Sequence, residues 1–189
     1  MSAQARVTGK EAVMQAVVEA ACELMAEKQP SQLSIREIAK EAGVNHGLIH
    51  RHFGSKQNLI SHVVAHIDTE MRETAGRDGD FQRAFTLATE LATADARFWK
   101  IVARLILDGY GELLQTDQTS YLRDLRDLAT KEYGSSETLG LSLDESLYML
   151  IALGLGHEMF GDYISQSMGV EPPDTHVLLY KVLKLFAVE

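Results

Sequence analysis

The residues whose types could do chemistry gather in one short stretch of the chain, from Lys28 to His66. This stretch holds five basic residues, two acidic residues and five of the seven histidines. Between Glu41 and Asp68 there is no acidic residue. Basic surfaces attract polyanions, and arginine, lysine and histidine donate hydrogen bonds to phosphate oxygens and base edges. The stretch therefore indicates an interaction with nucleic acid.

The net charge of the whole chain, −9, argues in the opposite direction. The distribution of charge resolves this conflict. Residues 28–66 carry five positive and two negative charges, a net +3, whereas residues 67–189 carry 11 positive and 21 negative charges, a net −10. A basic head on an acidic body can approach a polyanion through the head, while the body is repelled.

Other kinds of site are weakly represented. His46 and His50, and likewise His62 and His66, are spaced i, i+4 and could bind zinc, but no third ligand is evident, and the single Cys22 makes a cysteine-based site implausible. The chain has no Gly-rich phosphate loop, no Gly-x-Ser-x-Gly elbow and no His-Glu-x-x-His motif. We therefore expect no metal, no cofactor, no catalytic residue and no enzyme activity.

The composition is that of an ordinary globular protein. With 189 residues, of which 46% are apolar and 24% charged, the chain fits one domain, or a small domain on a larger one. The N-terminus lacks the apolar core of a signal peptide, and the longest uncharged run, Leu147 to Gly156, is far shorter than the ~18 residues of a membrane span. These features predict a cytoplasmic protein without a membrane partner.

The elements that must position the basic residues are expected to be helices. Three prolines and almost no β-branched alternation predict an all-α fold of about nine helices. The expected helices cover residues 10–28, 34–41, 45–52, 56–75, 81–93, 95–114, 118–133, 142–168 and 174–188.

The second and third of these helices are short and close together. Ser34 and Glu37 form a capping box, in which the two side chains satisfy free amides at a helix start. Asn45 can cap the next helix, and Ser55 the long helix after it. The turn of residues 42–44 is tight and contains glycine. This pattern predicts a helix-turn-helix, in which the first helix braces the second against the DNA major groove.

A family resemblance covers the stretch from Leu33 to Ile60, LSIREIAKEAGVNHGLIHRHFGSKQNLI. This stretch strongly resembles the DNA-binding signature of the TetR (tetracycline-repressor-like) family of transcriptional regulators. Family members usually have tyrosine at the position of His50, and a glycine followed by an aromatic residue where Gln29-Pro30 stands. The matching positions are Ile38-Ala39, Gly43-Val44, Gly47 to Phe53, and Ser55 to Leu59.

The resemblance implies an architecture and a function. It implies an N-terminal three-helix helix-turn-helix DNA-binding domain, residues 1–55, joined by a long helix to a C-terminal helical ligand-binding and dimerisation domain, residues 56–189. It also implies a sequence-specific transcriptional regulator, most often a repressor. Such a protein acts as a homodimer on a double-stranded DNA operator, from which a small hydrophobic effector releases it.

The resemblance and the chemistry of the side chains together predict which residues contact DNA. The start of the second short helix points into the groove, arginine is the usual reader of guanine, and a lysine at a helix N-terminus suits a phosphate. A simple polar surface helix is the alternative, and His52 could equally be packed. The expected contacts are Ser34, Arg36, Asn45, His46, Gly47, His50, Arg51, His52 and Lys56.

The last two helices offer a surface for a dimer. The last helix is apolar on nearly all sides, so it must be covered on two faces. Gly154 and Gly161, seven residues apart on one face, permit close approach of helices. With the resemblance, this predicts a four-helix interface between two protomers, and a buried helix in a monomer is the alternative. The expected interface residues are Gly154, Gly161, Leu178, Val182, Leu185 and Phe186.

The resemblance also implies a ligand pocket among the middle helices. Its candidate residues are mostly apolar or aromatic, which suggests a hydrophobic small molecule, and His157 would mark a polar end. Each candidate could instead belong to the ordinary core. The candidates are Met71, Phe85, Phe98, Trp99, Val102, Leu105, Tyr121, Met149, Leu153 and His157.

A second hypothesis retains the helical body without a DNA-binding role. The protein would then be a helical small-molecule-binding or interaction protein whose head is non-functional. The basic charge of residues 28–66 argues against this alternative.

Overall fold

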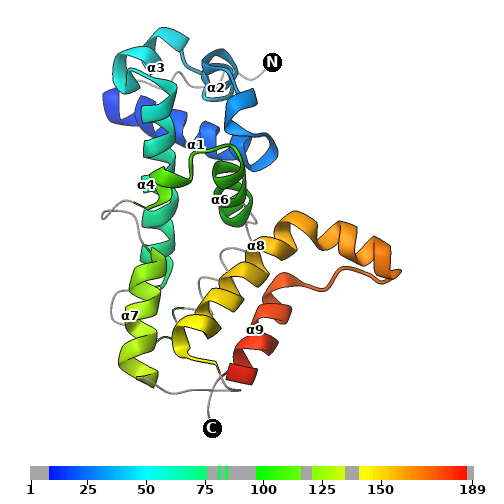
Figure 1. The fold of residues 1–189 in the computed structure, drawn as a ribbon. Helices are drawn as coiled ribbons and strands as arrows, with labels where there is room; N and C mark the ends of the chain where they lie inside the picture. The colour runs from blue at the N-terminus through cyan, green and yellow to red at the C-terminus, as the bar shows by residue number, and fades with distance from the viewer. Residues whose placement is uncertain are drawn as a thin grey trace. The chain divides into compact units, whose positions relative to one another are not determined.

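The structure is a computed structural model that describes residues 9–75, 81, 84, 97–115, 121–134 and 141–186. For residues 74, 75, 176, 183, 185 and 186 only the backbone is described. Every secondary-structure element in these ranges is a helix (Figure 1). The elements are α1 (Lys10–Glu27), η1 (Pro30–Gln32), α2 (Ile35–Glu41), α3 (His46–Phe53), α4 (Lys56–Ala75), α6 (Arg97–Leu107), η2 (Gly111–Leu114), α7 (Tyr121–Tyr133), α8 (Leu143–Met168) and α9 (Thr175–Phe186).

The chain divides into two compact units, and neither is continuous in sequence. The first unit comprises Met1–Thr69 and Arg104–Thr119, and the second comprises Glu70–Ala103 and Ser120–Glu189. Helices α4 and α6 each have one end in either unit. The predicted boundary after residue 55 has all the expected DNA contacts except Lys56 on its N-terminal side, and it stays a prediction.

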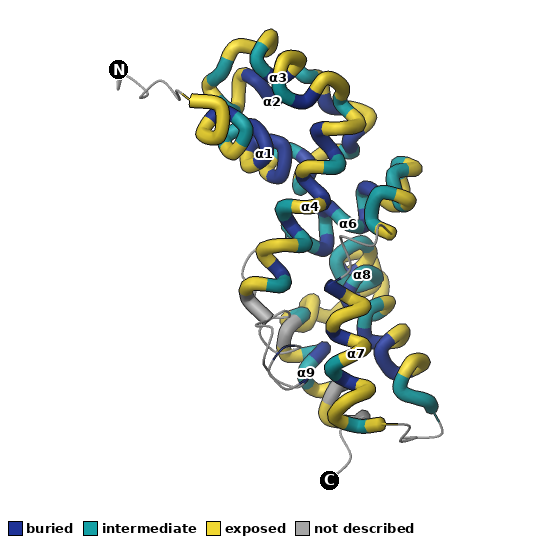
Figure 2. Tube along the Cα trace, turned by 90° about the vertical axis from the view of Figure 1, so that its left-hand side faces the viewer, coloured by how far each residue is buried: buried dark blue, intermediate teal, exposed yellow. Residues whose placement is uncertain are grey.

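The first unit has a core formed by α1, α2, α3 and the start of α4. Apolar residues of α1 recur at helical spacing, so one face of this helix is buried (Figure 2). Val17 and Met25 of α1 pack inside the unit with Ile38 of α2, Ile49 of α3 and Leu59 of α4, all at most 1% exposed. This core fixes the position of α3, whose remaining faces are polar.

The helix starts of the first unit agree with the sequence prediction. The Ser34 hydroxyl accepts a hydrogen bond from the Glu37 amide (3.1 Å), and the Ser34 amide donates to the Glu37 carboxylate (2.8 Å). The hydrogen bonds that the Ser34 amide and the Ser34 hydroxyl donate to the Glu37 carboxylate lower the pKa of Glu37. The Ser55 hydroxyl accepts from the Asn58 amide (3.1 Å) at the start of α4. The caps at Ser34 and Ser55 are therefore confirmed.

The second unit has its own core. Met71 of α4, Tyr121 and Leu125 of α7, and Leu147 and Leu150 of α8 form one buried cluster. The Tyr121 hydroxyl donates to the Ala84 carbonyl (3.5 Å), and burial raises the pKa of Tyr121. Helices α8 and α9 pack together within this unit.

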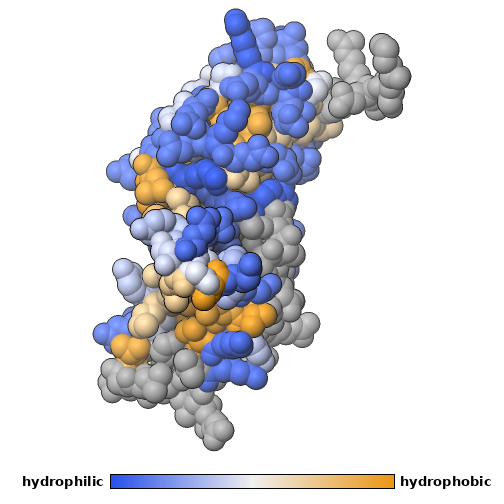
Figure 3. Space-filling view, turned by 90° about the vertical axis from the view of Figure 1, so that its right-hand side faces the viewer, coloured by the Kyte–Doolittle hydropathy of each residue, from blue (hydrophilic) through white to orange (hydrophobic). Residues whose placement is uncertain are grey.

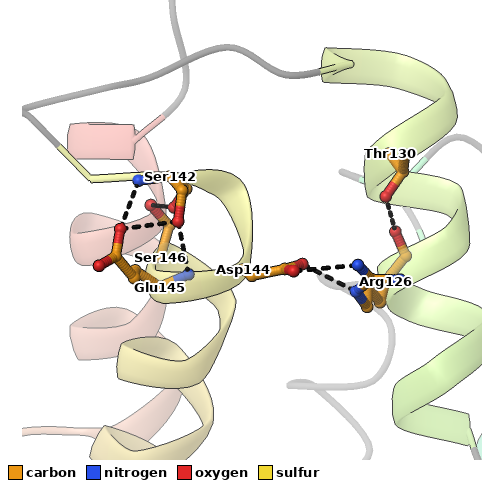
Figure 4. Close-up of polar contacts among 6 residues, drawn as sticks. All are labelled: Arg126, Thr130, Ser142, Asp144, Glu145 and Ser146. Carbon is orange, nitrogen blue, oxygen red and sulfur yellow. Dashed lines mark hydrogen bonds and ion pairs between the residues drawn. The ribbon is translucent and has the colours of Figure 1, made fainter.

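The start of α8 also carries a capping box (Figure 4). The Ser142 amide donates to the Glu145 carboxylate (2.8 Å), and the Ser142 hydroxyl accepts from the Glu145 amide (3.4 Å). Arg126 of α7 donates two hydrogen bonds, of 2.7 and 2.9 Å, to the Asp144 carboxylate. The cap fixes the start of α8, and the ion pair joins the exposed sides of α7 and α8.

The helix expected over residues 95–114 is interrupted, so that prediction was wrong in its extent. Helix α6 ends at Leu107, and Gly109 has a φ of +83°, which favours glycine. The Gly109 amide donates to Ile106 O (3.2 Å), and the Tyr110 amide donates to Leu105 O (2.8 Å). This is the Schellman pattern, which closes a helix. The expected helix over 81–93 lies outside the described residues, apart from Phe81 and Ala84.

Among the described helices, none has the length and apolar character needed to cross a membrane. No group of three or more His, Cys, Asp or Glu side chains that could hold a metal ion occurs in the described ranges.

Candidate nucleic-acid interface

Helix α3 separates its apolar and polar residues cleanly. Ile49 and Phe53 are buried in the first unit. Of the six expected DNA contacts between Asn45 and His52, five are exposed, and no acidic residue lies on this helix. A helix anchored by two apolar residues thus presents a polar face that contains a full positive charge. The exposed residues are Asn45, His46, Gly47, His50 and Arg51.

The start of α3 is held by Asn45. The Asn45 Oδ1 accepts a hydrogen bond from the Gly47 amide (2.8 Å), which confirms the predicted N-cap. A Cβ added at Gly47 would lie 3.2 Å from that Oδ1. Glycine therefore leaves room for the cap and exposes the backbone to a close ligand. The cap uses the Asn45 oxygen, so its amide nitrogen is the group left to donate to DNA.

The other predicted DNA contacts differ in how far they are exposed and in whether they already have a partner within the chain. Arg36 is exposed near the start of α2. His52 is half-buried, so its ring is neither fully packed in the core nor fully open to DNA. Ser34 is exposed, but its hydroxyl belongs to the capping box. Lys28 pairs with Glu37 at 3.5 Å, which offsets one of the two acidic charges of the head.

Lys56 has a contact that the sequence did not predict. Its ammonium donates to Leu33 O at 2.6 Å and to Ser31 O at 3.4 Å. The Ser31 carbonyl lies in η1 and the Leu33 carbonyl directly after it, 25 and 23 residues earlier in the chain, so no local sequence signal could identify them. Lys56 therefore stabilises the connection between α1 and α2, in addition to its predicted role toward phosphate.

Replacement of Lys56 separates these two roles. We expect Lys56→Ala to weaken binding to every DNA sequence, because the variant loses a charge or a structural contact near the DNA surface. If the ammonium reaches a phosphate, the slope of log affinity against log salt falls by about one unit. The measurement is fluorescence anisotropy at several salt concentrations.

Lys40→Ala provides the control, since Lys40 is exposed in the same unit. A Lys56→Ala variant with weaker binding and an unchanged salt slope would remove Lys56 from the phosphate contacts. The structural contact to Leu33 would then be its whole contribution.

Comparison with known proteins decides the family. The family model described as bacterial regulatory proteins, tetR family, matches residues 17–63. The HTH-type transcriptional repressor Rv3405c of Mycobacterium tuberculosis (strain ATCC 25618 / H37Rv) is 32% identical over 166 residues, which cover 87% of this chain and 81% of the relative. The chain belongs to the TetR family. The HTH-type transcriptional regulator Mb3439c of Mycobacterium bovis matches to the same extent.

Solved structures show the TetR fold over nearly the whole chain. FadR from Bacillus subtilis, solved in complex with stearoyl-CoA, superposes with a TM-score of 0.63 at 19% identity and covers 90% of this chain and 96% of its own. NalD from Pseudomonas aeruginosa gives a TM-score of 0.56 at 21% identity, with coverages of 92% and 95%. The fold is therefore all-α, with an N-terminal helix-turn-helix domain and a C-terminal helical domain. The protein is a DNA-binding transcriptional regulator of the TetR family and not an enzyme.

The residues predicted to line a TetR ligand pocket have varied surroundings. Met71, Trp99, Leu105 and Tyr121 are buried, and Met149 is exposed. Leu105 belongs to the first unit and the others to the second. Phe85 lies outside the described residues. The half-buried candidates are Phe98, Val102, Leu153 and His157.

Trp99 stands out among these candidates. Trp99 is 7% exposed, and its indole Nε1 is buried without a hydrogen-bond partner among the residues that the structure describes. Leaving a buried donor unpaired costs about 1–3 kcal/mol. The ring lies against α8, where a Cβ added at Gly154 would be 3.4 Å from Trp99 Cζ2. Trp99 is thus a tightly packed residue with one unused polar group.

The residues predicted for the TetR dimer interface also differ in their surroundings. Gly154 and Gly161 are buried on the inner face of α8: Gly154 lies against Trp99 and Leu179, and Gly161 lies under the ring of His157. Leu178 and Val182 of α9 are half-buried, and the side chains of Leu185 and Phe186 lie outside the described residues. The glycines thus serve packing within the protomer in the structure.

A different face of α8 is apolar and exposed, and the sequence analysis did not single it out. Four of the exposed large residues, from Tyr148 to Tyr163, lie on the side of the helix away from the buried Leu150 and Gly154, whereas Ile164 and Met168 lie nearer to the buried face, at the C-terminal end. No sequence signal separated the two faces, because α8 is apolar nearly all round. The exposed large residues are Tyr148, Met149, Phe160, Tyr163, Ile164 and Met168.

Proposed function

We propose that the protein is a dimeric repressor whose two α3 helices bind an operator and whose affinity for the operator is lowered by a hydrophobic effector. The observation that carries this proposal is the exposed, acid-free face of α3 on a buried anchor of Ile49 and Phe53. A recognition helix of this kind enters the major groove with its N-terminal end. The protein would work in the cytoplasm, where a bacterial operator lies.

The chemistry of the α3 face supports direct reading of bases. Arg51 can donate two hydrogen bonds to a guanine, and the Asn45 amide nitrogen can donate to an acceptor on a base edge. His46 and His50 are exposed one turn apart and can donate to bases or phosphates. Arg36 of α2 adds a further donor. Together with Gly47, these residues form the proposed DNA surface, with Ser34, His52 and Lys56 at its margin.

The exposed apolar face of α8 supports the homodimer. Six large apolar side chains are exposed on this one helix, which is more than the singly scattered apolar residues of ordinary surfaces. Hydrophobic residues gather over the second unit on the side shown in Figure 3, whereas the first unit is mostly hydrophilic there. Because one head makes few contacts, two linked heads are needed for tight binding to an operator. A second copy of the chain is therefore the proposed occupant.

The unpaired Trp99 Nε1 supports an effector site in the second unit. An effector with a hydrogen-bond acceptor beside an apolar body would satisfy this donor and bury its own apolar surface against the neighbouring side chains. Among the fold's relatives, FadR from Bacillus subtilis was solved with stearoyl-CoA. Long-chain acyl-CoA is accordingly the first probe for this chain.

The test selects duplexes from a random-sequence DNA library with the purified protein. We expect an enriched, approximately palindromic sequence whose half-sites lie one helical turn or a multiple of it apart. Stearoyl-CoA, or a shorter acyl-CoA in parallel, should weaken binding to this duplex and change the fluorescence of Trp99, the sole tryptophan. Failure to enrich any duplex at low salt would refute the proposed function, and release without a change in fluorescence would place the effector away from Trp99.

A further inference from the structure

A carboxylate at the end of α6 binds the turn that precedes α2. The Ser31 amide donates to Asp108 Oδ2 at 2.5 Å, and the Ser31 hydroxyl donates to Asp108 Oδ1 at 2.7 Å. The two residues are 77 positions apart in the chain but belong to the same compact unit. One carboxylate therefore uses both of its oxygens on a single residue of the DNA-binding head.

The amide of Ser31 has no partner within its own turn. The first amides of a helix lack intrahelical acceptors, and Pro30, at the start of η1, has no N–H. The Gln32 amide donates to Gln29 O (3.0 Å), which leaves Ser31 as the free donor of the turn. Asp108 supplies the missing acceptor. A hydrogen bond to a charged acceptor is about twice as strong as a neutral one.

Lys56 also binds this turn, and one of its two hydrogen bonds, of 3.4 Å, goes to Ser31 O. Its ammonium donates to Leu33 O at 2.6 Å, one residue before the cap of α2 at Ser34. Leu33 is 2% exposed, so its side chain is anchored in the core as well. The connection between α1 and α2 is thus bound by an anion from α6 and a cation from α4.

Asp108 is itself fixed in position. It follows Leu107, the last residue of α6, and its amide donates to Arg104 O (2.9 Å). The next residue, Gly109, makes the left-handed turn that closes the helix. The backbone at this helix end is therefore fixed by hydrogen bonds, and it holds the Asp108 carboxylate in one position beside Ser31.

We propose that Asp108 is a positioning residue for DNA binding: through Ser31 it fixes the start of α2, and thereby the orientation in which α2 holds α3. This inference rests on the proposed function. A head already held in its binding geometry loses less conformational freedom on DNA. Residue 108 therefore contributes to operator affinity without touching DNA.

The test compares a graded series of variants on the duplex selected by the wild-type protein. Ser31→Ala removes one hydrogen bond, Asp108→Asn removes the charge and leaves one acceptor, and Asp108→Ala removes both bonds. We expect Asp108→Ala to lower the affinity about tenfold and the two milder variants to lower it less. The slope of log affinity against log salt stays unchanged, because no phosphate contact is lost.

Two further measurements exclude a general loss of stability. Stoichiometric titration gives the active fraction of each variant, and Asp127→Ala, an exposed aspartate of α7, provides the matched control with wild-type affinity. In the Asp108→Ala background, Ser31→Ala should have no further effect, whereas independent destabilisation would add. Faster hydrogen exchange of the Ser31 amide in Asp108→Ala would agree with the proposal.

The experiment distinguishes failure of the positioning role from failure of the proposed function. Wild-type affinity for Ser31→Ala and Asp108→Ala, or additive losses in the double variant, would overturn the positioning role while the proposed function stands. If the wild-type protein selects no duplex, the proposed function fails and this inference fails with it.

Discussion

Arg51→Glu should abolish binding to the operator while the helical fold stays intact. Arg51 is exposed on α3, and no acidic residue lies on that helix. Reversal of the charge removes a base or phosphate contact and places a carboxylate against the DNA. Loss of such an arginine contact alone costs about 1–3 kcal/mol, so with the added repulsion the affinity should fall by at least ~100-fold. Anisotropy with the selected duplex measures the affinity, and circular dichroism measures the helical content.

The matched control is Lys131→Glu. Lys131 is exposed on α7, and its replacement changes the net charge of the chain by the same two units. Equal losses in both variants would mean that total charge, and not the α3 face, determines affinity. Undiminished binding by Arg51→Glu would favour the alternative of a non-functional head, especially if the protein still bound its effector.

Tyr163→Glu combined with Phe160→Glu should convert the protein to monomers and weaken operator binding. Both residues are exposed on α8, at 73% and 57%, so a charge there leaves the core of the protomer undisturbed. In a dimer the same carboxylates would be buried against apolar side chains, which is strongly unfavourable. Loss of the linked second head removes the avidity of the pair, so we expect the affinity to fall by about 100-fold or more. Sedimentation velocity measures the oligomeric state.

Leu122→Glu serves as the control for this experiment. Leu122 is also an exposed apolar residue, at 40%, but it lies on α7. It should leave the oligomeric state and the operator affinity unchanged. A Tyr163→Glu/Phe160→Glu variant that remains a dimer would show that the exposed face of α8 is not the interface. The residues of α9 would then be the next candidates.

The parts of the head that were predictable from sequence are governed by local interactions. Asn45 caps α3 through an amide two residues later, and Ser34 and Glu37 satisfy each other across one turn. Such contacts depend on residue type and spacing alone. The helix-turn-helix and its exposed residues could therefore be predicted without a structure.

The contacts that sequence analysis missed join distant parts of the chain. Lys56 binds Leu33 O, and Asp108 binds Ser31, and neither pairing follows from a pattern along one helix. The end of α6 was missed for another reason: Asp108 and Gly109 interrupt an apolar pattern that resumes at Leu113, so the periodicity suggested one long helix.

Which face of α8 is buried could not be predicted from the sequence either. Gly154 and Gly161 share a face, but spacing does not say whether the neighbour of such a face is the same chain or another. In the structure the neighbour of Gly154 is Trp99 of its own chain. A helix that is apolar on nearly all sides has no separate polar and apolar faces, so its buried face cannot be predicted from the sequence.

Because the first unit is built from two separate segments of the chain, it cannot fold completely until the second segment has been translated. Its N-terminal stretch ends at Thr69, but the unit is complete only with the segment from Arg104 to Thr119. During synthesis, α2 and α3 leave the ribosome well before the acceptor for the Ser31 amide has been translated. In a nascent chain halted before Asp108, the turn at Ser31 would therefore lack its two hydrogen bonds to the Asp108 carboxylate. Full ordering of the DNA-binding end would follow translation of a segment that itself never meets the DNA.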